Sequence, residues 1–256
     1  MAVSIKSERE IELMRESGRI LGEVHEKLKE IIKPGISTLE IDIEGEKLIR
    51  GYGCIPNFLH YNGFPGSICV SINEEVVHGI PKKSRKLKEG DIVSLDCGLI
   101  YKGYHSDAAR TYPVGEVDPE VLKLVKETEN CFFEGIKFAK EGNHLHDISN
   151  AIDAYATKCG YGVVTALVGH GIGTSLHEDP SVPNYHMNNR GIKLQAGMTL
   201  AIEPMINLGR GDVDFLDDGW TCVTSDRLPS SHYENTILIT KGEPEILTLP
   251  KRNQYN

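Results

Sequence analysis

The sequence lacks the features of a secreted, membrane-spanning or nucleic-acid-binding protein. Its first residues contain no apolar signal core, and no apolar run approaches the roughly 18 residues that a membrane helix needs. The six cysteines include no CxxC pair, and a chain of 256 residues does not need disulfides in order to fold. The formal net charge of −9 argues against a nucleic acid or an anionic membrane held by bulk electrostatics. We therefore expect a cytoplasmic protein with free thiols and no nucleic-acid or membrane partner.

The chain has enough apolar residues for a sizeable core. Of its 256 residues, 39% are hydrophobic and 25% are charged, as in an ordinary globular protein. One basic run, residues 82–88, departs from the acidic average. A solvated loop explains this run more simply than a docking patch does, so we assign it no function.

Capping signals and apolar periodicity predict four helices, arranged as two pairs. In both helices of the first pair, a serine is followed three residues later by a glutamate, which is the spacing of a capping box. Short strand-like runs follow each pair, from about residue 67 to residue 114 and again after residue 162. The predicted helices run from Ser7 to Lys33, from Ser37 to about Gly51, from Asp118 to about Lys140, and through Ile148 and Ile152 to about Gly160.

The order helix, helix, strands therefore occurs twice, and the repeat has a register. The residues that recur 107 positions apart are Gly35 and Gly142, Gly90 and Gly197, and Asp96 and Glu203. This pattern predicts an internal duplication. We expect one catalytic domain, residues 1–256, built from two α+β halves of about 1–114 and 115–256 that are related by pseudo-symmetry. Binding sites often lie between such halves.

Four carboxylates and one histidine stand within or beside apolar, strand-like runs that contain no Lys or Arg. They are Asp96, Asp107, His170, Glu203 and Glu234. Burying a lone ionised carboxylate is costly, so each must be paired, protonated or bound to a metal. Four carboxylates balance the charge of two divalent cations, and a neutral imidazole can serve as a further ligand. The set predicts two divalent metal ions and does not choose among Co, Mn, Fe and Zn.

The first two carboxylates flank a predicted hairpin turn near residues 101–103. A two-residue loop at 101–102 places Asp96 opposite Asp107, whereas a loop at 102–103 places Asp96 opposite Ala109 and diagonal to Asp107. Side chains alternate along a strand, so both registers put the two carboxylates on one face. Their Cβ atoms would lie about 5 Å or about 7 Å apart. Either separation suits a metal pair, in which the ions lie about 3.5–4 Å apart. An odd loop length would place Asp107 on the wrong face.

These residues lie in motifs that resemble those of the type I methionine aminopeptidases, in the creatinase/aminopeptidase superfamily and peptidase family M24. The matching stretches are Val76–Pro81, Ser94–Gly98, His105–Asp107, Gly169–Gly173, Leu176–Pro180, Ala201–Pro204 and Tyr233–Thr236. The resemblance covers nearly the whole chain. It implies the pita-bread fold, in which two α+β halves surround a central antiparallel sheet with helices on the outside. It also implies removal of the initiator methionine from nascent proteins whose second residue is small, by a monomeric enzyme of the bacterial type, at the ribosome.

The same resemblance assigns roles to residues. Asp96 and Asp107 would bind one metal, His170 and Glu203 the other, and Asp107 and Glu234 would bridge the pair. Glu203 would also accept and return protons. His78 and His177 would bond the scissile amide and the tetrahedral intermediate. The implied methionine pocket consists of Tyr61, Phe64, Cys69 and Trp220, with Phe58 and Leu176 nearby. The departures from the common bacterial pattern, which bear on the shape of this pocket, are Phe58, Phe64, Leu176 and Val77.

Two other functions are compatible with the same motifs. One is a prolidase or Xaa-Pro aminopeptidase of the same fold, which would usually carry a large additional N-terminal domain. The other is a metal-free, non-catalytic pita-bread binding protein, although such relatives usually lose metal ligands. Only 25 residues separate His177 from Glu203, which leaves no room for the helical insert of the type II enzymes.

Overall fold

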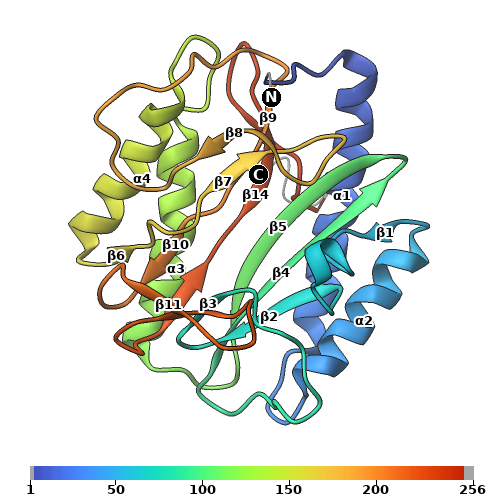
Figure 1. The fold of residues 1–256 in the computed structure, drawn as a ribbon, viewed down its shortest axis with the longest axis vertical. Helices are drawn as coiled ribbons and strands as arrows, with labels where there is room; N and C mark the ends of the chain where they lie inside the picture. Colours follow the sequence, from blue (N-terminus) through green and yellow to red (C-terminus); the bar gives the residue numbers. More distant parts are fainter. Residues whose placement is uncertain (1–2, 251–256) are drawn as a thin grey trace.

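In the computed structural model, residues 3–250 form four α-helices on the outside of a set of antiparallel strands (Figure 1). The helices are α1 (Glu8–Ile31), α2 (Thr38–Gly51), α3 (Pro119–Ile136) and α4 (Leu145–Cys159). In Figure 1, α1 and α2 lie on one side with the long hairpin, and α3 and α4 lie on the other. The predicted α+β class is confirmed. None of the described helices is long and apolar enough to cross a membrane.

The helix ends follow the predicted signals, with one exception. The Ser37 N–H donates to the Glu40 carboxylate at 2.9 Å, which is half of the predicted capping box. Gly160 ends α4 with a φ of 83°, in the left-handed region that favours glycine. The predicted end of the third helix at about Lys140 is wrong. The helix stops at Ile136, and Lys140 instead forms a parallel bridge with Thr240.

Every strand pair in the described part of the chain is antiparallel. One sheet has the order β1-β4-β2 with β5 beside β4, and the largest has the order β15-β14-β9-β7-β8. Two small sheets, β13-β10-β6 and β11-β12-β3, complete the strand layer. A single-turn 3₁₀ helix, η1, spans Tyr61–Gly63. The strands are β1 (Ile55–Pro56), β2 (Ile68–Ile72), β3 (Glu75–Val77), β4 (Ile92–Tyr101), β5 (Tyr104–Pro113), β6 (Gly162–Val163), β7 (Gly169–Gly171), β8 (Glu178–Val182), β9 (Thr199–Ile202), β10 (Met205–Asn207), β11 (Val213–Phe215), β12 (Cys222–Thr224), β13 (Ser230–His232), β14 (Asn235–Leu238) and β15 (Glu245–Ile246).

Each pair of helices covers its own sheet with its own apolar core. Leu21 and Leu28 of α1 pack with Leu95 of β4 in the first core, whereas Phe132 of α3 packs with Leu200 of β9 in the second. All five side chains are fully buried. Burial of this kind is the main force that holds each helix pair on its sheet.

The two sheets meet where β5 runs beside β14. The Glu234 N–H donates to the Ala109 carbonyl at 2.9 Å, and the Asp107 N–H donates to the Thr236 hydroxyl at 3.0 Å. This junction brings carboxylates from both halves of the chain together.

Candidate functional site

The long hairpin of β4 and β5 places Asp96 and Asp107 on one face. Its two-residue loop is Lys102-Gly103, with φ values of 50° and 87°, and two left-handed residues are typical of a tight hairpin turn. The register pairs Asp96 with Ala109, so Asp107 is diagonal to Asp96. Of the two registers that the sequence allows, the structure has the one with its loop at 102–103.

A second ladder places Glu203 opposite Glu234. Ile202 of β9 pairs with Asn235 of β14, and Met205 of β10 pairs with His232 of β13, so the register is the same on both sides of the break at residues 203–204. Pro204 cannot donate to a ladder, which accounts for the break. The Tyr233 N–H still donates to the Pro204 carbonyl at 3.2 Å. Glu203 and Glu234 therefore stand across from each other, and His232 lies on the same face, diagonal to Glu203.

His170 lies on β7 between two glycines, at positions where the neighbouring backbone leaves no space for a side chain. A Cβ on Gly169 would lie 2.4 Å from the Ala201 carbonyl oxygen, and one on Gly171 would lie 2.2 Å from that of Asp179. The His170 Nδ1–H donates to the Gly171 carbonyl at 2.8 Å, which leaves Nε2 with a free lone pair. Nε2 lies 3.6 Å from Glu203 Oε1 and 3.9 Å from Asp107 Oδ2.

The four carboxylates are too buried and too close to one another to be stable as free anions. Burial raises the pKa of Asp96 to about 7. Burial first, and then repulsion by the neighbouring carboxylates, raises the pKa values of Asp107, Glu203 and Glu234 well above their ordinary range. One oxygen each of Asp96, Asp107 and Glu234 is buried with no hydrogen-bond partner among residues 3–250. Cations would satisfy these oxygens and hold the groups ionised.

The donor atoms are grouped as a metal site requires. Asp107, His170 and Glu234 each offer one ligand atom, and these three atoms lie within 4.8 Å of one another. The oxygen-rich donor set with one imidazole suits divalent first-row metals. The residues present therefore fit one or more divalent ions.

All of the predicted site residues line one cavity of about 280 Å³. Its walls hold the five residues of the metal set, His78 and His177, and the predicted pocket residues Tyr61, Phe64, Cys69 and Trp220, together with Phe58 and Leu176. Four further lining residues were not predicted: Asn62, Leu167, Val168 and Met205. Met205 could have been found, because it lies two residues beyond Glu203 and so on the same face of the strand.

The two histidines outside the metal set are oriented by aromatic neighbours. The Tyr61 hydroxyl lies 2.7 Å from Nδ1 of His177, whose ring centroid is 4.3 Å from that of His170. His78 has a φ of 60°, which is unusual for a residue with a side chain and is typical of functional sites. Its ring meets the Trp220 ring edge to face, with centroids 6.3 Å apart. Burial lowers the pKa of His177, and burial with His177 nearby lowers the pKa of His78 to about 4.

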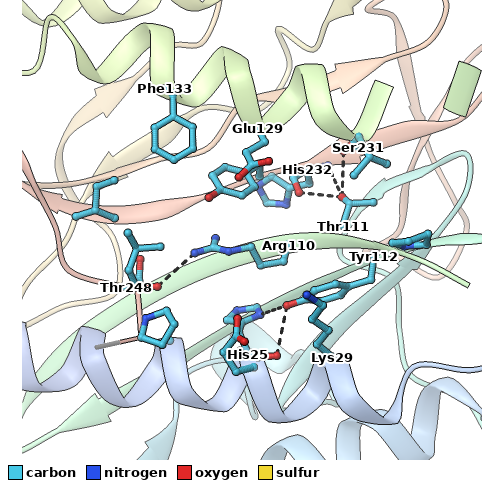
Figure 2. Close-up of a pocket in the computed structure, with 18 of the residues that line it drawn as sticks. His25, Lys29, Arg110, Thr111, Tyr112, Glu129, Phe133, Ser231, His232 and Thr248 are labelled. Atoms are coloured by element: carbon cyan, nitrogen blue, oxygen red, sulfur yellow. Dashed lines mark hydrogen bonds between the residues drawn. The ribbon is translucent and has the colours of Figure 1, made fainter. Parts of the chain in front are cut away.

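A larger groove, of about 990 Å³, lies between α1 and α3 and contains none of the predicted site residues (Figure 2). Arg110 and Thr111 of β5 and His232 of β13 line it. Arg110 donates to the Asn235 side chain at 2.5 Å and also bonds the Glu234 carbonyl, so it ties β5 to β14 directly behind the carboxylates.

Comparison with known proteins agrees with this geometry. Residues 12–241 match the model of metallopeptidase family M24. The chain is 53% identical to a methionine aminopeptidase of Clostridium perfringens, over 97% of this chain and 100% of that protein. It superposes on the crystal structure of methionine aminopeptidase from Rickettsia prowazekii with a TM-score of 0.95 and 39% identity, covering 97% and 100% of the two chains. An Xaa-Pro dipeptidase from Bacillus anthracis is more distant, with a TM-score of 0.75 and 25% identity over 95% of this chain and 61% of that one.

Proposed function

The chain belongs to metallopeptidase family M24 and to the methionine aminopeptidases within it, with their pita-bread fold, and from this premise we propose how its cavity works. The reaction is hydrolysis of the peptide bond that follows an amino-terminal methionine. One observation carries the assignment of this reaction to the 280 Å³ cavity. The buried carboxylates of Asp96, Asp107 and Glu234 converge there with the largely buried Glu203 and with His170, and none of the described lining residues is Lys or Arg.

We propose that the site holds two divalent ions. Asp96 and Asp107 would hold one, His170 and Glu203 the other, and Asp107 and Glu234 would bridge them. The unpaired buried oxygens and the free Nε2 of His170 support this assignment. Mn, Fe, Co and Zn all suit such a donor set. When bound, such ions polarise the scissile carbonyl and lower the pKa of the attacking water.

Three side chains of the cavity act on the substrate and on protons. Glu203, whose side chain is 14% exposed and lies across from Glu234, accepts the proton of the attacking water and returns it to the leaving amine. The Tyr61 hydroxyl donates to Nδ1 of His177, which leaves the Nε2–H of that ring free to bond the scissile amide. His78, next to Trp220, donates to the tetrahedral intermediate.

The apolar part of the cavity receives the methionine side chain. Phe64, Cys69 and Leu176 are buried there, and Trp220 meets Phe64 edge to face with ring centroids 5.2 Å apart. Aromatic rings and a thiol suit a polarizable thioether. With Phe58 completing this wall, the cavity has room for one large side chain, as an enzyme that removes a single residue needs.

We further infer the setting in which the enzyme acts. Residues 1–256 would form one catalytic unit with halves of about 1–114 and 115–256, acting as a monomer on nascent chains at the ribosome in the cytoplasm. All six cysteines are free, which supports a reducing compartment. Light scattering on the protein as it elutes from a sizing column tests the monomer, because a mass well above 28.4 kDa would contradict it.

Peptide hydrolysis with defined metals tests the proposed function. Metal-free protein should not cleave Met-Ala-Ser, and Mn, Fe, Co or Zn added in turn should restore cleavage to at least one sample. A matched Xaa-Pro peptide should be cleaved far more slowly. Preference for the Xaa-Pro peptide would assign a prolidase-like activity instead. Absence of bound metal together with absence of cleavage under every condition would assign a non-catalytic protein.

A further inference from the structure

We propose that His232 is a positioning residue for Glu203: its Nε2–H donates a hydrogen bond to Glu203 Oε2 and fixes the plane of that carboxylate. This inference rests on the proposed function, because it concerns the group that holds a metal and moves a proton there. His232 belongs to none of the motifs that carry the family resemblance.

The backbone of His232 is held in place from the neighbouring half. Its N–H donates to the hydroxyl oxygen of Thr111 at 3.0 Å, and the same hydroxyl donates to the His232 carbonyl at 2.9 Å (Figure 2). Thr111 lies on β5, four residues after Asp107. Two bonds from one side chain leave little freedom in the direction of the histidine Cα–Cβ bond.

The ring is buried without a partner. His232 is 1% exposed, and neither Nδ1 nor Nε2 has a hydrogen-bond partner among residues 3–250. Leaving a buried donor without a partner is costly, so such a group in a folded protein calls for an explanation. The nearest carboxylate supplies one, because Nε2 lies 3.8 Å from Glu203 Oε2. A shift of roughly 1 Å would give an ordinary N–H···O distance.

Glu203 thus stands between two histidines that have different roles. Nε2 of His170 is 3.6 Å from Oε1, and Nε2 of His232 is 3.8 Å from Oε2. His170 also groups with ligand atoms of Asp107 and Glu234, whereas the carboxylate within 4 Å of His232 is that of Glu203. His232 therefore acts on the metal site through Glu203. A donor on Oε2 leaves Oε1 directed toward His170 and the cations, as outer hydrogen bonds do for metal ligands generally.

Substitutions at position 232 can separate this role from simple packing. His232→Leu removes the donor and keeps most of the volume. His232→Gln keeps an amide N–H at about the position of Nε2, whereas His232→Asn carries the same amide one carbon short of Glu203. His146→Leu is the control, because His146 is also buried, lies on α4 and bonds the Asn189 carbonyl far along the chain from the site.

The measurements are Mn²⁺ affinity of the metal-free proteins by calorimetry, thermal unfolding, and steady-state hydrolysis of Met-Ala-Ser. His232→Leu should lower the Mn²⁺ affinity or kcat by about 10–100-fold, the usual cost of losing an outer hydrogen bond to a ligand. KM should change little. His232→Gln should recover most of the loss. If the leucine variant does not fold, the comparison of Gln with Asn decides, and Asn should be the impaired one.

Two results would overturn the role of His232. One is wild-type Mn²⁺ affinity and kcat in His232→Leu, and the other is a glutamine variant no better than the asparagine variant. A lower unfolding temperature in both His232→Leu and His146→Leu, without any change in Mn²⁺ affinity or kcat, would also reduce His232 to packing. Failure of the proposed function is distinguishable, because the wild-type protein itself would then neither bind Mn²⁺ nor cleave the peptide.

Discussion

The two halves of the molecule present their carboxylates in different ways. In the first half, Asp96 and Asp107 project from an unbroken hairpin, and the ladder of β4 and β5 alone decides where they point. In the second half, Glu203 and Glu234 stand opposite each other, next to the break in the ladder at Pro204. Their longer side chains depend on neighbouring groups for their direction. We infer that backbone register fixes the first pair, whereas side-chain contacts fix the second, so the two halves should fail differently when they are mutated.

The largest effect should come from Asp107→Asn. This substitution removes the charge of the first-half carboxylate that is proposed to bridge the ions. Its side chain is buried, and one of its oxygens has no partner in the described structure. The amide carries no charge to balance a cation. We expect bound metal to be lost and kcat for Met-Ala-Ser to fall by more than about 100-fold, the upper end of the cost of removing an outer partner of a ligand. Elemental analysis and steady-state kinetics measure the two effects.

His177→Ala provides the contrast within the same cavity. His177 contacts Tyr61 and the His170 ring, and it is not one of the five residues proposed to hold metal. Its loss should slow turnover while metal content stays at the wild-type level. Loss of metal in His177→Ala would contradict the role given to His177, and retention of metal in Asp107→Asn would contradict the role given to Asp107.

A smaller effect is expected for Arg110→Gln, which tests the junction between the halves. Arg110 of β5 bonds the Glu234 carbonyl and the Asn235 side chain, and its guanidinium lies 4.5 Å from the Tyr233 ring centroid. Removing it takes this donor from the Glu234 carbonyl, while the Asn235 side chain keeps only the Thr248 hydroxyl, so the free energy of unfolding should fall by about 2 kcal/mol. Urea titration measures the change.

Arg50→Gln is the matched control for Arg110→Gln. Arg50 pairs with Glu46 one turn away on the surface of α2, within the first half, and is not among the residues that line the cavity. An exposed ion pair contributes about 0.2–1 kcal/mol. Equal losses in the two variants would mean that Arg110 does not tie the second half to the first.

The same contrast explains what the sequence could predict. Alternation along strands was sufficient to put Asp96 and Asp107 on one face, because both possible even-length loops give that result. It could not choose between the registers, since the choice depends on the left-handed backbone of Lys102 and Gly103. The end of α3 was missed because Lys140 pairs with Thr240, a contact across 100 residues of chain that no local signal encodes.

The second half was less predictable at its site. The sequence shows Glu203 and Glu234 but not that they stand opposite each other, because the pairing of β9 and β10 with β13 and β14 joins segments that are separated by β11, β12 and their loops. Met205 and His232 each lie two residues from a predicted ligand, which is the signal that could have found them. Residue roles such as those of His78 and His177 came from the family resemblance and not from spacing.

Acid should weaken the first half through His25, with an effect of about 2 kcal/mol. His25 is buried on α1 and bonds the Ala108 carbonyl at 2.9 Å. Burial, and next the charge of Arg110, lowers its pKa to about 3, against roughly 6.5 in an unfolded chain. Between these values the unfolded state binds more protons, so stability is present above pH 6.5 and falls as the pH falls toward 3. From pH 7 to pH 5 the loss is about 2 kcal/mol.

Comparison with His25→Gln isolates this contribution, because other acid-sensitive groups cancel in the difference. Glutamine can still donate to the Ala108 carbonyl but takes up no proton. The stability advantage of the wild-type protein over the variant should therefore be smaller at pH 5 than at pH 7, by about 2 kcal/mol in urea titrations. If the difference in stability between the wild-type protein and His25→Gln does not change with pH, the pKa of His25 is not lowered in the native protein.

The smallest effect concerns Lys6, through which the N-terminal segment supports the second half. Its backbone N–H donates to the Gly197 carbonyl, and its ammonium lies 2.7 Å from Glu178, with side-chain exposures of 3% and 14%. Glu178 directly follows His177 and also accepts from the Ser175 N–H at 3.2 Å. Lys6→Met keeps the packing and removes the charge, so the loop that carries His177 should be held less firmly. We expect kcat to fall by about tenfold, since small misplacements of a catalytic group are costly.

The property that Lys6→Met changes distinguishes the Lys6–Glu178 ion pair from the metal site. Mn²⁺ affinity should stay unchanged in Lys6→Met, in contrast to His232→Leu, because Lys6 acts on a substrate-binding histidine and not on a ligand. The double variant Lys6→Met/Glu178→Gln should lose less than the two single changes together, since the pair acts as a unit. Arg190→Met, at an exposed pair with Asp147, should have no effect on kcat. Loss of metal in Lys6→Met would mean that the N-terminal segment supports the ligands themselves, and the second half would then depend on the first for its metal as well as for its substrate contacts.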